Sequence, residues 1–384
     1  LELGAGAFLF EARLCAGSRE AEDDAWLLSD GAWRAFAADA FEDLPRSGIG
    51  GMAPESVDAR ALPVDWQAVA FEDAGWSAAV ELSASGMGFQ GHHEPPSPPY
   101  GALRARPIAR LGCERRDPVA IGWATGPRGD LRADPAEQVR ADLGAGADWR
   151  ILPDPAAAIR LSCGPSQVAL VHVDFGEVVC GTVLLAVDAP AGARIDVAGT
   201  ETAPDPTGVA PGEEHASFRY VARGHDDRFE TFGPLGFRWL TLSVRADGPV
   251  QLAGVAVNER LYPRPRASRD EDGPSFACSD PLLEEVWRVG RRSVDLNSQD
   301  AYLDCPTREQ RAWTGDFVVH QMVDLTTSTD WRLATWNVEL AASPRADGML
   351  PMAAGGDLEF YDTAYIPDWA LHWVHALHNL WRYT

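Results

Sequence analysis

Three carboxylic acids, two arginines and a tryptophan lie close together in one short stretch of the chain. The stretch reads Asp304-Cys-Pro-Thr-Arg-Glu-Gln-Arg-Ala-Trp-Thr-Gly-Asp316 and has Glu309 near its middle. Like charges that are brought together raise one another's pKa, and a tryptophan that removes water raises it further. A carboxyl group that stays protonated near neutral pH can act as a general acid. The stretch therefore predicts acid catalysis by one of its carboxyl groups.

The same stretch is expected to form a loop between two helices. Pro306 disfavours a helical conformation at Cys305, and Thr314-Gly315 interrupts the chain before the next helix. Loops commonly carry functional groups. Cys305 has no histidine placed to activate it, so it is interpreted as a small buried residue and not as a nucleophile.

Each polar side chain of the stretch also has a purely structural alternative. These alternatives are an ion pair of Glu309 with Arg308 or Arg311, a turn cap at Asp304, a helix cap at Asp316 and core packing of Trp313. Capping and ligand binding are compatible, because one carboxylate can accept several hydrogen bonds. The residue types alone therefore leave both interpretations open.

The residues after 275 show the spacing of helices that would position this loop. Asp280-Pro281 is a favourable helix start, because aspartate can cap the first turn and proline suits the first helical position. The apolar stripe that follows consists of Leu283, Val286, Gly290 and Val294. Further helices are expected at 316–325, 331–342 and 368–382.

Much of the chain before residue 266 has the period-two alternation of β-strands. Clear alternating runs cover 168–174, 183–187, 195–197 and 237–244. Residues 150–266 are therefore predicted to form an antiparallel β-sandwich. Residues 1–100 are predicted to form a smaller N-terminal β-sandwich, similar in outline to carbohydrate-binding modules, and residues 101–149 a connecting segment. The proline-rich run 91–100 is expected to be a linker or a surface loop.

Composition disfavours several classes of function. The formal net charge of −24 disfavours nucleic acid, whose phosphates need a basic surface. No apolar run approaches the roughly 20 residues that cross a bilayer, so no membrane partner is expected. Six cysteines are scattered without a CxxC pair, which favours reduced thiols and a cytoplasmic protein. His372, His375 and His378 recur every third residue, but no set of cysteines or carboxylates completes a metal site, so no metal is predicted.

The motif at 304–316 and several flanking segments resemble one enzyme family. The motif closely resembles the signature of bacterial α-L-rhamnosidases, glycoside hydrolase family 78. Residues 173–181 and 233–239 are similar to strands of that family's central β-sandwich. Residues 276–280 and 297–303 resemble the opening helix of its catalytic barrel. Residues 347–351 and 366–369 resemble further barrel loops and helices. The resemblance is clear from about residue 165 to 384. It implies two antiparallel β-sandwiches followed, at residues 275–384, by the first part of an (α/α)6 barrel.

The resemblance also implies a role for each site residue. Glu309 would be the general acid that protonates the oxygen between rhamnose and its leaving group. Five residues are proposed to bind the substrate. Asp304 and Asp316 would hold sugar hydroxyls, and Arg308 would orient the acidic cluster. Trp313 would stack on the sugar, and Trp369 would contact it, although core packing of Trp369 is an equal alternative. The family inverts the anomeric centre, which needs a second carboxylate roughly 6.5–9.5 Å away. No cofactor is implied.

The expected function is hydrolysis of terminal α-L-rhamnose from a plant glycoside or polysaccharide. In the family the general base lies further along the barrel, so we expect it beyond residue 384 and expect residues 1–384 alone not to hydrolyse rhamnosides. Two alternatives remain: a non-catalytic carbohydrate-binding protein with a vestigial barrel, and another inverting (α/α)6 glycosidase. Assembly as a homodimer is also left open.

Overall fold

The computed structural model describes most of the chain, in two compact units. The described residues are 11–14, 25–44, 53–80, 105–144, 149–203, 216–264, 275–342, 350, 352–353 and 366–384. The first unit consists of residues 1–39 and 62–106, and the second of residues 40–61 and 107–384. Residues 40–61, which were expected in the N-terminal sandwich, therefore belong to the second unit. The proline-rich run 91–100 lies outside the described residues.

In the first unit, the described strands form two small sheets. β1 (Glu11–Leu14) pairs with β2 (Ala25–Leu28), and β3 (Arg34–Ala35) pairs with β5 (Ser77–Ala78), both antiparallel. Trp76 packs against Phe36, with 5.3 Å between the ring centroids. A complete β-sandwich over residues 1–100 remains a prediction.

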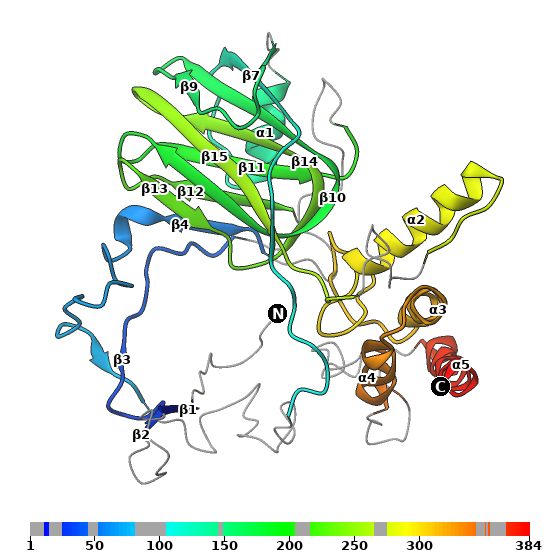
Figure 1. Cartoon of the computed structure of the whole chain (residues 1–384). Helices are drawn as coiled ribbons and strands as arrows, with labels where there is room; N and C mark the ends of the chain where they lie inside the picture. The colour runs from blue at the N-terminus through cyan, green and yellow to red at the C-terminus, as the bar shows by residue number, and fades with distance from the viewer. Residues whose placement is uncertain are drawn as a thin grey trace. The chain divides into compact units, whose positions relative to one another are not determined.

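The second unit is built on a large sheet of eleven strands (Figure 1). The strands are β4 (Glu55–Asp58), β6 (Glu114–Arg116), β7 (Ala120–Pro127), β8 (Arg150–Ile151), β9 (Ile159–Ser162), β10 (Gln167–Asp188), β11 (Arg194–Thr200), β12 (Ser217–Val221), β13 (Asp227–Glu230), β14 (Leu235–Arg245) and β15 (Pro249–Glu259). Their main order is β4-β12-β11-β14-β10-β15-β6, with β7 and β13 also on β10, β8 on β7 and β9 on β15. A single 3₁₀ turn, Ala59–Ala61, follows β4. The ladders are antiparallel except that β4, from a segment far upstream, pairs with β12 in parallel.

β10 connects two parts of this sheet, because its neighbours change along its length. Its first part, as far as Asp174, lies between β14 and β7, and residues Leu184–Val187 lie between β15 and β13. The register shifts between Asp174 and Val179, where Gly176 has a φ of +81° that suits glycine. Phe229 of β13 stacks on Tyr220 of β12 at 4.8 Å, so the two parts of the sheet face each other.

The predicted strands at 168–174, 183–187, 195–197 and 237–244 are confirmed, although the first two are parts of one strand, β10. Val168, Ala169, Leu170 and Val171 are all fully buried. Both faces of β10 are therefore covered over this stretch, which agrees with its nearly continuous apolar sequence.

Residues 101–149, expected as a connecting segment, contain regular structure where they are described. β6 and β7 join the large sheet, and helix α1 (Pro135–Leu143) packs its Val139 and Leu143 in one cluster with Leu170 of β10. The carboxylate of Asp142 on α1 forms a buried ion pair with Arg245 of β14. β7 reads AIGWATGP, and its small residues weaken the alternation that identifies a strand. The segment therefore forms part of the sheet unit.

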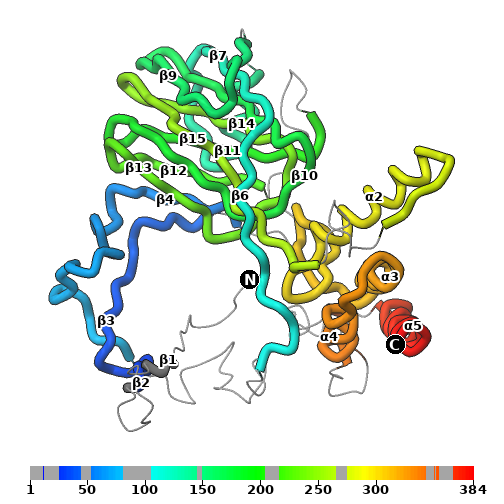
Figure 2. Tube along the Cα trace, viewed as in Figure 1, coloured from blue at the N-terminus to red at the C-terminus, as the bar shows by residue number. Residues whose placement is uncertain are grey.

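Four helices follow in the described residues after 275: α2 (Pro281–Leu296), α3 (Phe317–Thr327), α4 (Arg332–Ala341) and α5 (Pro367–Tyr383). The expected start of α2 is confirmed, because the Asp280 side chain accepts a hydrogen bond from Leu282 N at 2.9 Å. α3 contacts both α4 and α5 (Figure 2), and Tyr302, Phe317 and Leu333 are fully buried in the shared core. Within the described residues, no helix is both long enough and apolar enough to span a membrane.

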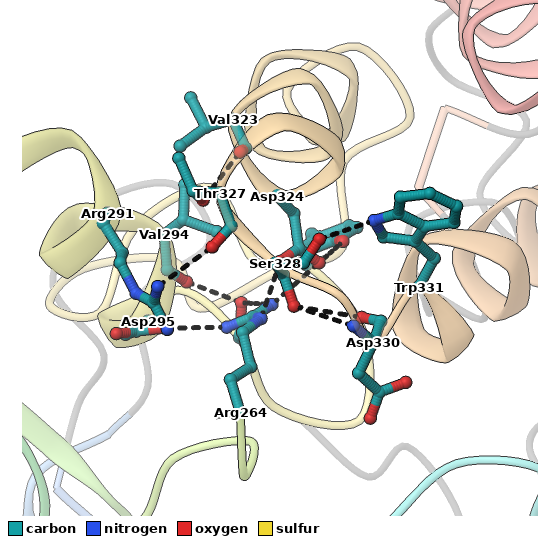
Figure 3. A network of polar contacts seen from close by, with 12 residues as sticks. Arg264, Arg291, Val294, Asp295, Val323, Asp324, Thr327, Ser328, Asp330 and Trp331 are labelled. Atoms are coloured by element: carbon teal, nitrogen blue, oxygen red, sulfur yellow. Dashed lines mark hydrogen bonds and ion pairs between the residues drawn. The ribbon is translucent and has the colours of Figure 1, made fainter. Parts of the chain in front are cut away.

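The predicted apolar stripe of α2 is wrong as a description of its buried face. Val294 is buried, but Leu283 and Val286 are 51% and 60% exposed. The residues of α2 that face the protein lie near its C-terminal end, where Arg291 and Val294 meet α3 (Figure 3). The helical spacing of the apolar residues in α2 identified an apolar face, but it could not show that most of this face is exposed.

A buried polar network joins the segment after β15 to α2 and α3 (Figure 3). Arg264, whose side chain is 3% exposed, lies 2.9 Å from Asp295 and 2.8 Å from Asp324, and it donates to Ser298 Oγ at 2.8 Å. The Tyr302 hydroxyl also donates to Asp324. One guanidinium therefore fixes α2 and α3 relative to each other.

Candidate active site

Residues 304–316 form the loop between α2 and α3 that the sequence predicted. Asp304 N donates to Arg311 O at 2.9 Å, and Arg311 N donates to Asp304 Oδ1 at the same distance, so the loop closes on itself. Gln310 has a φ of +50°, and its Nε2 donates to Pro306 O at 3.0 Å and to Pro234 O, before β14, at 2.9 Å. The loop is therefore held both internally and by the sheet.

The loop also packs closely against β14 through a glycine. A Cβ placed on Gly236 would lie 2.3 Å from Pro306 O, which is too close for any side chain. Gly236 thus allows the backbone of β14 to approach the backbone of the loop. The large sheet is part of what positions Glu309.

Glu309 is held by hydrogen bonds from two neighbouring side chains. Trp313 Nε1 donates to Glu309 Oε2 at 2.5 Å, and the Arg308 guanidinium contacts the other carboxylate oxygen. Glu309 N donates to Cys305 Sγ at 3.3 Å. The Glu309 side chain is only 15% exposed, whereas Arg308 is 57% exposed. The carboxylate is therefore fixed in position by the loop and contacted from the surface by the exposed side chain of Arg308.

The second tryptophan of the site comes from α5. The rings of Trp313 and Trp369 meet edge to face, with centroids 5.2 Å apart. A Cβ on Gly315 would lie 2.4 Å from the indole of Trp369, so this position also requires glycine. Trp313 bridges to Ala353 as well, and Thr314 N donates to Met352 O at 2.9 Å. Segments far apart in the sequence thus converge on the loop.

The electrostatics of the three carboxyl groups differ from the expectation. Burial raises the pKa of Asp304, and the charge of Glu309 raises it further. Burial and the charge of Glu309 also raise the pKa of Asp316, although the imidazole of His372 acts in the opposite direction. Burial acts to raise the pKa of Glu309, but the hydrogen bonds from Trp313 and Arg308 outweigh it, so the pKa of Glu309 is lowered.

The expectation of a Glu309 kept neutral by crowded anions and an apolar indole is therefore wrong, because the pKa of Glu309 is lowered. The indole approaches with its N–H edge and donates a hydrogen bond, which stabilises the ionised carboxylate. Arg308 adds its positive charge. The raised pKa values belong to the two flanking aspartates instead.

Contacts connect five of the predicted residues, and the sixth, Asp316, interacts with Glu309 through its charge. Arg308, Glu309, Trp313 and Trp369 are linked by the contacts described above, and Asp304 is linked to Glu309 through the thiol of Cys305. Asp316 occupies the N-cap position of α3, but its side chain makes no capping hydrogen bond. The carboxylate of Asp316 is thus not needed for that structural role. Cys305 is partly buried, and its thiol donates to Asp304 Oδ2 at 3.4 Å.

Gln310 and His372 were not predicted as site residues. Gln310 ties the loop to the sheet, and its positive φ gave no sequence signal because glutamine rarely adopts it. His372 follows Trp369 by three residues on α5, a spacing that places both on one face of a helix and could have identified it. Among the described residues, no group of three or more His, Cys, Asp or Glu side chains is arranged to hold a metal ion.

Replacing Trp313 by phenylalanine tests the hydrogen bond to Glu309. The variant keeps an aromatic ring beside Trp369 but loses the indole N–H, so we expect the pKa of Glu309 to rise. A carboxyl group whose pKa is lowered by folding stabilises the protein at pH values above its ordinary pKa. This stabilisation is lost as the pH falls through the pKa of the folded state. Trp313→Phe should therefore lose less stability on acidification. The measurement is carbon-13 NMR titration of the glutamate carboxyls, with Trp381→Phe on the exposed part of α5 as control. An unchanged Glu309 titration would contradict the assignment.

Part of the chain matches a known protein family. Residues 271–384 match the family described as the bacterial alpha-L-rhamnosidase 6 hairpin glycosidase domain. An alpha-L-rhamnosidase of Formosa agariphila is 28% identical over 159 residues, which are 38% of this chain and 15% of that protein. The chain therefore spans about a seventh of that relative.

Solved structures show the same fold. A family 78 rhamnosidase of Bacillus sp. GL1 superposes with a TM-score of 0.70 at 18% identity, over 93% of this chain and 55% of that one. An α-L-rhamnosidase of Streptomyces avermitilis complexed with L-rhamnose superposes with a TM-score of 0.57 at 18% identity, over 87% of this chain and 26% of that one. Residues 271–384 therefore match the glycosidase domain of bacterial alpha-L-rhamnosidases, and over 93% of its length the chain shares the fold of a family 78 rhamnosidase.

Proposed function

We propose that the protein is an α-L-rhamnosidase that releases terminal α-L-rhamnose from glycosides or polysaccharides. The observation that carries the proposal is the fixed carboxylate of Glu309, held at 2.5 Å by Trp313 between two aspartates with raised pKa values. The rhamnosidases to which the chain is similar support the choice of sugar. The family resemblance implies that the large sheet forms a β-sandwich and that the four helices form part of an (α/α)6 barrel, and we extend this architecture to the present chain.

In this proposal, Glu309 donates its proton to the oxygen between rhamnose and the leaving group. The bond between that oxygen and the anomeric carbon breaks, and the leaving group departs as an alcohol. The hydrogen bonds from Trp313 and Arg308 lower the pKa of Glu309, and the Arg308 guanidinium lies against its carboxylate. Entry of the sugar would displace water and the exposed guanidinium, and both changes raise the pKa of Glu309. Glu309 would then take up the proton that it transfers.

The remaining site residues bind and orient the sugar. Carboxylates of Asp304 and Asp316 accept hydrogen bonds from its hydroxyls, and the ring of Trp313 lies against an apolar face of the sugar. Trp369 holds Trp313 in place by its edge-to-face contact. Water attacks from the opposite face and inverts the anomeric centre; the carboxylate that accepts its proton is expected outside residues 1–384.

A second function, sugar binding without hydrolysis, is favoured by one observation. The carboxylate of Glu309 is fixed by the Trp313 N–H and can accept a hydrogen bond from a sugar hydroxyl without any proton transfer. The two functions differ in turnover: a binding protein holds L-rhamnose and releases no product from a rhamnoside.

Hydrolysis of a series of p-nitrophenyl glycosides tests the proposed function. We expect the natural protein to hydrolyse the α-L-rhamnoside and to hydrolyse the α-L-mannoside about tenfold less efficiently, because an added hydroxyl is only weakly rejected by an apolar pocket wall. Residues 1–384 alone should bind L-rhamnose without turnover. A higher kcat/KM on the glycoside of an unrelated sugar would indicate a different glycosidase. Binding of L-rhamnose by the natural protein without hydrolysis of the rhamnoside would favour the second function.

A further inference from the structure

A second pocket opens at the opposite end of α3 from Glu309. It has a volume of about 480 Å³, and its lining includes Pro107, Asp330, Trp331, Arg332, Trp336 and Glu339. This volume lies within the range of small-molecule sites, roughly 300–1,000 Å³. α3 has 11 residues and separates Asp316 from the pocket, a length of about 16 Å at 1.5 Å per residue. The pocket is therefore distinct from the site at Glu309.

The loop that forms one wall of this pocket is held by hydrogen bonds (Figure 3). Ser328 N donates to Asp324 O at 2.8 Å, and Asp330 N donates to Ser328 Oγ at 3.1 Å. Arg291 donates to Thr327 O at 2.9 Å from α2. Little ordering of this wall is needed when a ligand binds, which favours affinity.

Two indole rings in the wall of the pocket are also fixed by hydrogen bonds. Trp331 Nε1 donates to Ser328 O at 2.8 Å, and Trp336 Nε1 donates to Asp300 O at 3.0 Å. Their N–H groups are therefore occupied by backbone carbonyls. Both side chains remain partly exposed, so what they offer to a ligand is ring carbon with a negative face.

The charges around the pocket disfavour an anionic ligand. Arg332 forms a two-point ion pair with Asp330, at 2.9 and 2.6 Å, and lowers the pKa of that carboxyl. Glu339 adds a second carboxylate at the rim. Because Arg332 is paired with Asp330, an anionic ligand would meet the carboxylate of Glu339 and a chain with a net charge of −24.

We propose that this pocket is a second carbohydrate-binding site, which takes a neutral pyranose unit. The C–H face of a pyranose ring is apolar and slightly positive, so it stacks on indole faces. Its hydroxyls can donate to the carboxylates of Asp330 and Glu339 and accept from Arg332. The site would hold a sugar unit remote from the cleaved bond, and its occupancy does not depend on catalysis at Glu309.

Fluorine NMR of the chain with 5-fluorotryptophan in place of tryptophan tests this proposal. Signals of Trp331 and Trp336 are assigned with the Trp331→Phe and Trp336→Phe variants. The probe is the neutral disaccharide α-L-rhamnosyl-(1→6)-D-glucose. We expect both signals to shift on titration, and Trp336→Ala to weaken the affinity reported by Trp331 about fivefold. Trp336→Phe, which keeps a ring, should weaken it less.

The matched control is Trp381→Ala, which removes an indole that is 75% exposed on α5 and outside the pocket. The control should leave the Trp331 titration unchanged, and unshifted signals of the other tryptophans verify that each variant is folded. Shifts at Trp313 with none at Trp331 and Trp336 would overturn the second site and support the site at Glu309. Equal shifts with an anionic galacturonate disaccharide would overturn the assignment to neutral sugars.

Discussion

Replacing Glu309 by glutamine is expected to lower rhamnoside hydrolysis by the natural protein about 10²–10⁴-fold, the usual contribution of a general acid. Glutamine keeps the size of the side chain and an oxygen that can accept the Trp313 hydrogen bond, but it has no acidic proton to transfer. Binding of rhamnose should change little by comparison. The measurement is kcat and KM with methyl α-L-rhamnoside, whose alkoxide is a poor leaving group.

The leaving group distinguishes an acid catalyst from a structural residue. A substrate with a poor leaving group needs the proton, whereas rhamnosyl fluoride needs it much less, so Glu309→Gln should retain more activity on the fluoride. Glu285→Gln is a matched control, because Glu285 forms an exposed ion pair with Arg288 on α2, away from the motif. Equal losses on both substrates would show that Glu309 acts on structure rather than as an acid.

Replacing Arg264 by methionine is expected to lower the free energy of unfolding by about 3–5 kcal/mol, the usual effect of breaking a buried ion pair. The guanidinium of Arg264 is almost inaccessible to solvent, and its removal leaves the buried carboxylate of Asp324 without its cation (Figure 3). Denaturation by urea, followed by tryptophan fluorescence, measures the loss.

The pH dependence and a control separate this effect from a lost side-chain contact. Burial raises the pKa of Asp324, and Arg264 acts to lower it, so the variant should raise it further. A carboxyl with a raised folded-state pKa gains stability as the pH falls, and the destabilisation should therefore be smaller in mild acid than at neutral pH. Arg288→Met breaks the exposed pair with Glu285 and should change stability by less than about 1 kcal/mol. A loss independent of pH would contradict the role of Asp324.

Much of the local structure could be predicted from the sequence. The start of α2 follows from Asp280-Pro281, and the alternation of apolar residues in β10 and β14 identified both strands. The loop at 304–316 follows from Pro306 and Gly315, because these residues interrupt helices on either side. Local residue preferences determine each of these features.

Features that depend on long-range contacts could not be predicted. The pairing of β4 with β12, the contact of Gly236 with Pro306 and the edge-to-face contact of Trp313 with Trp369 join residues far apart in the chain. The electrostatic error at Glu309 has the same origin. Composition indicates that an indole is near a carboxyl group, but only the fold shows that the N–H edge faces it.

The central claim is that Glu309 faces the glycosidic oxygen of a bound rhamnoside. A crystal structure of the Glu309→Gln protein with p-nitrophenyl α-L-rhamnoside tests it most directly. We predict the side-chain amide of residue 309 at about 3 Å from the glycosidic oxygen, with the sugar hydroxyls on Asp304 and Asp316 and the sugar ring against Trp313. A rhamnoside bound elsewhere, with residue 309 turned into solvent, would contradict the account.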